Sequence, residues 1–138
     1  ETMRAVADKG GVIGVYFMPF LTLDSQPRGE DLVRHIEHVA KVVGVDHVGI
    51  GTDNGVLPPV ITEATRKSNR EWAMERIRRG IAAPGEGPDV FPIVADYNDV
   101  GRYRRLADVL GRRGWSTTRL EKFFGGNFLR VYRDAWGA

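Results

Sequence analysis

Two short apolar runs on either side of one amphipathic stretch restrict the fold of this chain more than any other feature. Neither run, residues 12–17 or residues 45–52, alternates polar with apolar residues, so both are expected to be strands buried on both faces. Between them, apolar side chains recur with a helical period from Asp31 to Val43, and Gly44 ends this predicted helix. The pattern predicts a strand–helix–strand unit with a right-handed parallel crossover, which begins either a barrel or a doubly wound sheet.

The flanking segments are expected to be helices and loops. Residues 3–9 resemble a helix end, and residues 18–28 a loop. Ser68 to Glu71 has the form of a capping box, which predicts a helix from there through about Ile81. Residues 83–92 hold prolines and glycines, which indicates an ordered loop or a mobile lid.

The last 40 residues are expected to form three helices. An apolar stripe from Tyr103 to Leu110 predicts the first, which Gly114 ends. Ser116 is expected to cap a short second helix, which Gly125-Gly126 breaks. Asn127 is then predicted to cap a final helix whose large side chains pack against the rest of the protein. These side chains are Phe128, Leu129, Val131, Tyr132 and Trp136.

Composition restricts the chain to one modest domain. Its 138 residues are too few for a complete eight-stranded barrel, and a formal charge of +2 gives no strong case for nucleic acid. Basic residues between Arg66 and Arg79 alternate with Glu71 and Glu75 at helical spacing, which favours an ion-paired, solvated face over a phosphate site. The absence of cysteine excludes disulfides, thiolate catalysis and Cys-ligated zinc. No apolar run has the length of a membrane span.

Asp53 follows the second predicted strand directly and is the main candidate for a catalytic residue. Asn54, Gly55 and Pro58-Pro59 cannot continue the strand, so the carboxylate is expected at its carboxyl end, where parallel barrels carry their catalytic groups. The alternative is that Asp53 caps the turn through backbone hydrogen bonds. Glycines around Asp53 resemble a phosphate cradle, but a carboxylate there favours a cation, a water or an ammonium group.

The three histidines give weaker signals. His35 and His38 are three residues apart on the predicted helix, with no further ligands nearby, so packing or surface roles are favoured over metal binding. His47 begins the second strand, at the end opposite Asp53. No serine lies in a Gly-x-Ser-x-Gly turn, so a Ser-His-Asp triad is not expected.

Two blocks of sequence, taken together, are more specific than either alone. They are His35-Ile36-Glu37-His38-Val39 with Gly44-Val45-Asp46-His47-Val48-Gly49-Ile50-Gly51-Thr52-Asp53, and Leu106-Ala107-Asp108-Val109-Leu110 with Arg113-Gly114-Trp115-Ser116 and Gly125-Gly126-Asn127-Phe128-Leu129-Arg130-Val131. The first block resembles the penultimate helix and last barrel strand of the membrane (renal) dipeptidase family, and the second is similar to that family's carboxyl terminus.

The resemblance implies a zinc-dependent hydrolase of dipeptides, or of related amides, on a (β/α)8 barrel of the TIM type. Residues 1–138 would be a single partial domain, the carboxyl-terminal segment, with residues 11–17 as strand seven and residues 45–52 as strand eight. Asp53 matches the family's strand-eight Asp, which implies that it accepts a proton from the metal-bound water and holds the substrate ammonium. Two zinc ions would activate that water and polarise the scissile carbonyl.

The resemblance also implies where the pocket walls lie. Asp53, Asn54 and Phe17 are the candidate substrate-binding residues, within loop walls at residues 17–21 and 56–59. The family's metal ligands and its carboxylate-binding Arg map before Glu1, so this chain should contain no metal ligands. It is then expected to be inactive alone, to need the remaining barrel strands, and to allow a homodimer.

The chain departs from the family pattern at two places. Asn54-Gly55 replaces a second acidic position, and residues 58–98 look longer than in the mammalian enzymes. Two other functions remain open. One is a barrel-derived binding module without turnover, which the altered Asn54-Gly55 loop motivates, and the other is a phosphosugar-processing barrel.

Overall fold

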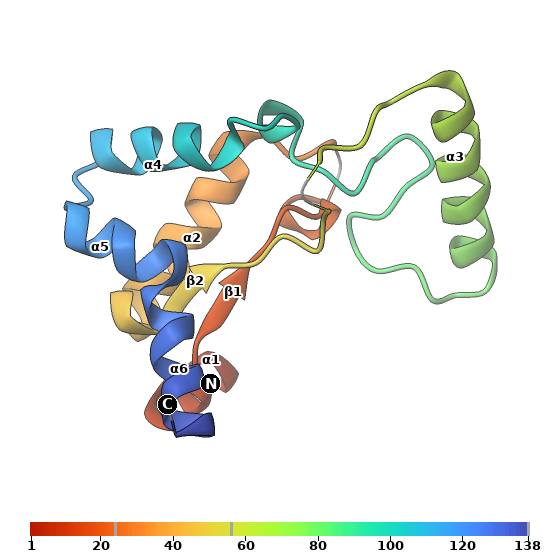
Figure 1. The fold of residues 1–138 in the computed structure, drawn as a ribbon. Coiled ribbons are helices and arrows are strands. Elements are labelled where there is room, and N and C mark those ends of the chain that lie inside the picture. The colour runs from red at the N-terminus through yellow and green to blue at the C-terminus, as the bar shows by residue number, and fades with distance from the viewer. Residues whose placement is uncertain (24, 56, 138) are drawn as a thin grey trace.

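The computed structural model describes residues 1–23, 25–55 and 57–137, in which two parallel strands pack with helices (Figure 1). β1 (Ile13–Val15) pairs with β2 (Val48–Ile50), and Gly14 lies opposite Gly49. α2 (Gly29–Val43) connects the two strands and ends at Gly44, where φ is 86°. The predicted strand–helix–strand unit and the α/β class are therefore confirmed.

The other elements follow in chain order. The helices are α1 (Thr2–Asp8), α3 (Glu63–Arg78), α4 (Arg102–Arg112), α5 (Thr117–Glu121) and α6 (Asn127–Trp136), and the short turns are η1 (Pro19–Leu21), η2 (Val45–His47), η3 (Ala95–Tyr97) and η4 (Lys122–Gly126).

Both strands are shorter than the apolar runs that predicted them. Residues 45–47 form the turn η2 before β2 begins, and His47 Nδ1 lies 2.9 Å from the Gly11 carbonyl oxygen. At the other end, the Gly51 amide donates to the Val15 carbonyl at 2.9 Å and carries the pairing one step further. The ladder thus covers three residues per strand, flanked by turns that the apolar pattern alone does not distinguish from strand.

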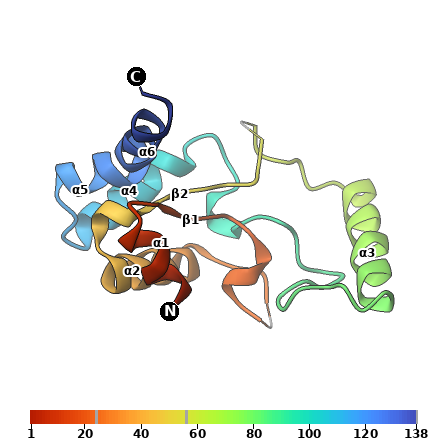
Figure 2. The ribbon, with the colours of Figure 1, turned by 90° about the horizontal axis from the view of Figure 1, so that it is seen from below.

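One core joins α2, the strands and the carboxyl-terminal helices. α2 lies along one face of the two strands, and α4 and α5 lie beside it (Figures 1 and 2). The side chains that share this core are all less than 10% exposed: Val15, Phe17, Leu21, Leu32, Val33, Ile36, Val39, Val48, Val94, Tyr97, Leu106, Leu110, Trp115 and Phe123. The apolar faces predicted for α2 and for α4 therefore contribute to the same core.

The opposite face of the strands is covered only in part by the described residues. A Cβ atom at Gly49 would lie 2.5 Å from Cε2 of Phe128, so the absence of a side chain allows α6 to approach the sheet. Gly14, its partner in the ladder, is exposed. The expectation that both faces are buried is therefore wrong for this face within the described chain.

The amino ends of the carboxyl-terminal helices differ in how they are capped. The hydroxyl of Ser116 accepts a hydrogen bond from the Arg119 amide at 3.3 Å, which confirms the predicted cap of α5. Asn127 does not cap α6, so that prediction is wrong. Its buried amide donates to the carbonyls of Val45 and Val48 instead, at 2.7 and 2.8 Å, and ties α6 to the start of β2.

The α6 side chains expected to pack against the rest are largely exposed. Leu129, Tyr132 and Trp136 are 54%, 46% and 77% exposed. Tyr132 stacks between Phe128 and Trp136, with ring centroids 6.4 and 4.9 Å away. For these three residues the packing expectation is wrong within the described chain, because only the Phe128 end of the row reaches the sheet.

α3 begins earlier than the sequence predicted. The Thr62 hydroxyl accepts from the Thr65 amide, and the Thr65 hydroxyl accepts from the Thr62 amide, so these two residues form the reciprocal cap. The predicted box at Ser68 to Glu71 is wrong, because it lies inside the helix. The signal at Thr62 was missed because Thr65, and not Glu or Gln, returns the hydrogen bond.

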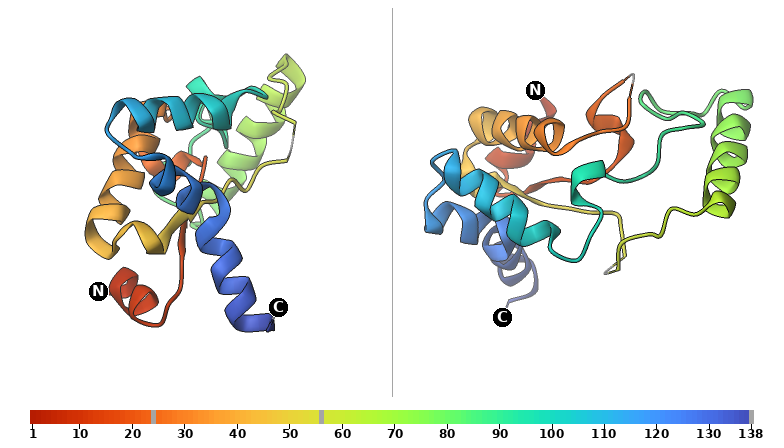
Figure 3. Two further views of the ribbon diagram at one scale, coloured as in Figure 1. Left: turned by 60° about the vertical axis from the view of Figure 1, so that its left-hand side comes forward. Right: turned by 90° about the horizontal axis from the view of Figure 1, so that it is seen from above.

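α3 and residues 81–92 form an arm that extends away from the body, on the side toward which the strands point (Figures 1 and 3). The Asn69 amide donates to the carbonyls of Pro88 and Val90, and Arg76 holds Glu86 through two hydrogen bonds of 2.7 and 3.1 Å. Other basic residues of α3 form ion pairs with nearby carboxylates, as the charge pattern predicted. They are Lys67 with Glu71, Arg70 with Asp89, and Arg78 with Glu75.

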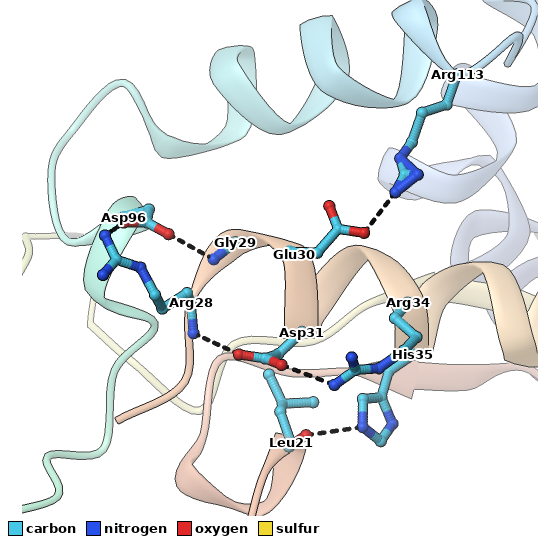
Figure 4. A network of polar contacts seen from close by, with 9 residues as sticks. All are labelled: Leu21, Arg28, Gly29, Glu30, Asp31, Arg34, His35, Asp96 and Arg113. Atoms are coloured by element: carbon cyan, nitrogen blue, oxygen red, sulfur yellow. Dashed lines mark hydrogen bonds and ion pairs between the residues drawn. The ribbon is translucent and has the colours of Figure 1, made fainter. Parts of the chain in front are cut away.

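A carboxylate from η3 holds the amino end of α2 (Figure 4). Asp96 accepts from the Gly29 amide at 2.7 Å and from Arg28 at 3.1 Å. The backbone hydrogen bond from Gly29, followed by that from Arg28, lowers the pKa of Asp96 below its ordinary value. The helix dipole favours a negative charge at this end as well.

We expect Asp96→Asn to flatten the loss of stability in acid. A carboxylate with a lowered folded pKa stabilises the fold fully above its unfolded pKa of about 3.9, and this stability is lost as pH falls through the folded value. The urea midpoints of wild type and Asp96→Asn should therefore differ most near pH 6 and converge toward pH 2.5. Asp8→Asn, an exposed position on α1, is the control and should leave the wild-type profile intact. Equal profiles for Asp96→Asn and wild type would contradict the assignment.

Candidate functional site

Asp53 lies just beyond the carboxyl end of β2, as the sequence predicted. Its φ of 52° is the only positive value among the described non-glycine residues. Asp and Asn adopt this left-handed conformation more readily than other residues with a side chain. The side chain of Asp53 is exposed.

The turn around Asp53 is held by its neighbours and not by its own carboxylate. The hydroxyl of Thr52 accepts from the Asn54 amide at 3.3 Å. Among the described residues, no donor forms a hydrogen bond or ion pair with the Asp53 carboxylate. The alternative that Asp53 caps this turn is therefore not supported, and its carboxylate is free to meet a ligand.

Asn54 connects the carboxyl ends of the two strands. Its side-chain amide donates to the Phe17 carbonyl, beyond β1, at 3.3 Å and to the Thr52 carbonyl, beyond β2, at 3.0 Å. Phe17 itself places its ring in the core, where only 2% is exposed and where it meets Tyr97 and Tyr103 edge to face. The structure thus brings Asp53, Asn54 and Phe17 together, with Phe17 linked through its carbonyl oxygen.

Sequence reasoning missed Arg102, the first residue of α4. It is 3% exposed, and its Nη2 donates to the Gly55 carbonyl at 2.7 Å. A single buried arginine among many basic residues has no sequence signal of its own. Its environment depends on α4 lying against the loop that follows β2, 47 residues away.

The expected loop walls are placed only in part. η1 lies within residues 17–21, and Tyr16 and Phe20 meet edge to face at 6.0 Å, both partly exposed. In the second wall, Val56 lies outside the described residues, and Leu57 is 75% exposed. A cavity of about 210 Å³ opens between β1, η1 and α2, lined in part by Tyr16, Phe20 and His35.

His35 and His47 each contact a backbone carbonyl oxygen. His35 Nε2 lies 3.0 Å from the Leu21 carbonyl and links α2 to η1 (Figure 4). His47 lies beside Gly11, at the amino end of the strands. Within residues 1–23, 25–55 and 57–137, no group of three or more His, Asp or Glu side chains could hold a metal ion. The described residues therefore do not supply a zinc site.

The helices of the described ranges are also informative about membranes. None of them is both long and apolar enough to cross a bilayer.

A protein-family comparison gives a match to most of the chain. The model for membrane dipeptidase, peptidase family M19, matches residues 1–83 and residues 80–136. The two matches meet just after α3, in the arm.

Curated relatives include two fungal dipeptidases. Dipeptidase ataJ of Aspergillus terreus is 31% identical over 97% of this chain, and dipeptidase tcpJ of Claviceps purpurea is 26% identical over 90%. An uncharacterized protein of Klebsiella pneumoniae, from the pqqA 5' region, is 28% identical over 99% of the chain. The chain spans 25%, 22% and 40% of these three relatives, respectively.

Two solved structures share the fold. An amidohydrolase from Pseudomonas aeruginosa superposes with a TM-score of 0.71 at 28% identity, and the match covers 99% of this chain and 40% of the amidohydrolase. The dipeptidase AC, a metallopeptidase of family M19, superposes with a TM-score of 0.65 at 20% identity, over 99% of this chain and 32% of its own.

Proposed function

Because this chain belongs to the membrane dipeptidase family, we propose that it is the carboxyl-terminal segment of a dipeptidase, which hydrolyses the peptide bond of dipeptides. The observation that carries the proposal is the Asp53 carboxylate, exposed and without a protein partner among the described residues, on a loop held at the carboxyl ends of both strands. In parallel α/β barrels this edge is where catalytic groups lie.

We assign β1 and β2 to strands seven and eight of a TIM-type barrel. Each strand has one hydrogen-bonding edge that pairs with no strand among the described residues. Strands of a closed barrel pair on both edges, and open edges otherwise recruit partners. The remaining strands of the barrel would cover these edges, and without them we expect the segment to be inactive.

The zinc ions are proposed to be held by residues outside this chain. The described residues do not fit a zinc site, since they offer no cluster of ligands. When bound, zinc would lower the pKa of a water molecule and polarise the scissile carbonyl. This chain would contribute the carboxylate that works beside it.

Asp53 is proposed to act as both ion-pair partner and proton acceptor. An exposed carboxylate can pair with the free ammonium of a dipeptide and fix its amino-terminal residue. The same group can accept a proton from the attacking water and return it to the leaving amine. Asn54 and Phe17 contribute to substrate binding by setting the position of this wall, through the hydrogen bond between the Asn54 amide and the Phe17 carbonyl.

The proposal predicts dipeptide hydrolysis by the longest polypeptide that contains this chain. Purified with zinc, it should hydrolyse simple dipeptides such as Ala-Ala, whereas N-acetyl-Ala-Ala, which lacks the ammonium group, should be a much poorer substrate because it cannot pair with Asp53. Residues 1–138 expressed alone serve as the control and should show no turnover. Failure of the complete polypeptide to hydrolyse any dipeptide would overturn the proposal.

The same preparation distinguishes the two alternatives. A binding module would bind dipeptides, measured by calorimetry, without hydrolysing them. A phosphosugar-processing barrel would gain thermal stability from inorganic phosphate and not from zinc. Either result would replace the dipeptidase assignment.

A further inference from the structure

We infer that Arg102 is a positioning residue for Asp53, an inference that rests on the proposed function of that carboxylate. Arg102 begins α4 and donates to the Gly55 carbonyl at 2.7 Å, two residues beyond Asp53. Arg102 is 3% exposed, so its charged group is largely removed from water, and the hydrogen bond to the Gly55 carbonyl is partly buried. A hydrogen bond from a charged donor contributes more than one between neutral groups.

The start of α4 also holds the other strand end. Tyr103, the next residue, contacts the ring of Phe17 edge to face at 6.3 Å, and the Arg102 guanidinium lies 5.1 Å from the centre of the Tyr103 ring. The Phe17 carbonyl in turn accepts a hydrogen bond from the side-chain amide of Asn54. Two consecutive residues of one helix therefore connect to the Asp53 turn on both sides.

The turn needs such support because its backbone is strained. Asp53 has a φ of 52°, a region that costs a residue with a side chain free energy and persists only when surrounding contacts hold it. Asn54 fixes the turn to the ends of the two strands, and Arg102 fixes its far side to α4. Loss of the Gly55 contact should let the carboxylate move, although Asp53 itself is unchanged.

The inference is tested by Arg102→Met in the complete polypeptide, which keeps an extended side chain and removes the donors. We expect kcat for dipeptide hydrolysis to fall about 10- to 100-fold, with a smaller change in KM, because small displacements of a catalytic group cost rate. Arg102→Lys keeps one charged donor and should restore part of the loss. Arg104→Met, an exposed position on the same helix, is the matched control and should behave as wild type.

A double-mutant cycle separates positioning from a merely structural role. If Arg102 acts through Asp53, adding Arg102→Met to Asp53→Asn should lower kcat no further. A multiplicative loss in the double variant, or an unchanged kcat in Arg102→Met, would overturn the inference. Should Arg102→Met not fold, the same cycle is run with Arg102→Lys.

Hydrogen exchange tests, without reference to activity, whether Arg102 holds the turn that carries Asp53. The backbone amide of Asn54, which donates to the Thr52 hydroxyl, should exchange at least several-fold faster in Arg102→Met than in Arg104→Met. If the wild type has no dipeptidase activity but this acceleration is seen, the proposed function is wrong, whereas the role of Arg102 in holding the turn is supported. If the exchange rates of the two variants are equal, Arg102 does not hold the turn, and the inference is wrong.

Discussion

Asp53→Asn should lower kcat for dipeptide hydrolysis by about 10²- to 10⁴-fold in the complete polypeptide, the range typical of a lost general acid or base. The amide has nearly the shape of the carboxylate but cannot accept the proton, and it has no charge to pair with the substrate ammonium. Steady-state kinetics with a simple dipeptide in zinc would measure the loss.

This substitution suits the backbone of the site. Residue 53 has a positive φ, and Asn is the residue with a side chain that tolerates this region best, so the fold should be retained. Asp108→Asn, an exposed position on α4, is the control and should leave kcat unchanged. A rate equal to wild type for Asp53→Asn would remove the carboxylate from the mechanism.

Much of the fold could be predicted because the relevant signals are local. The period of α2, its end at Gly44 and the two apolar runs gave the strand–helix–strand unit, and Ser116 gave the start of α5. The position of Asp53 followed from the same logic, since a polar turn after an apolar run places a side chain at a strand end. Each inference needed only neighbours in the sequence.

The predictions that proved wrong concern side chains that can choose between several hydrogen-bond partners. Asn127 was expected to cap its own helix, but its side-chain amide donates instead to the carbonyls of Val45 and Val48, beside which α6 packs. Thr62 and Thr65 cap α3 through two hydroxyls, a variant of the box that a search for Glu or Gln passes over. Such competition is decided by tertiary contacts, which a sequence pattern does not contain.

The candidate site likewise combines a feature that local sequence predicts with contacts that only the tertiary structure reveals. The carboxylate could be predicted, whereas its supports could not, because the Phe17 carbonyl and the Arg102 guanidinium come from elements 37 residues before Asn54 and 47 residues after Gly55. The family resemblance predicted which residues line the site but not which contacts hold them. Long-range contacts, and not local pattern, fix the geometry on which a catalytic group depends.

Phe123→Ala should have the largest effect on stability, about 3–5 kcal/mol, the usual cost of removing a large ring from a core. Phe123 lies in η4, is 0% exposed, and meets Trp115 and Phe124 edge to face at 5.7 and 5.0 Å. Its removal leaves a cavity beside Trp115 and Phe124, and η4 contacts β2, α5 and α6. Asn127 begins α6 four residues later. Movement there should therefore reach the start of β2 and, through that strand, the Asp53 turn.

Urea denaturation of the complete polypeptide, with intrinsic fluorescence as the signal, would measure the loss as a shift in midpoint at constant slope. Phe20→Ala is the matched control, because that ring is 36% exposed and lies in η1, away from the helices that surround Phe123. We expect it to cost less than about 1.5 kcal/mol, since much of the ring is already in water. Equal midpoint shifts for the two variants would mean that the aromatic cluster around Phe123 does not hold the carboxyl-terminal helices against the sheet.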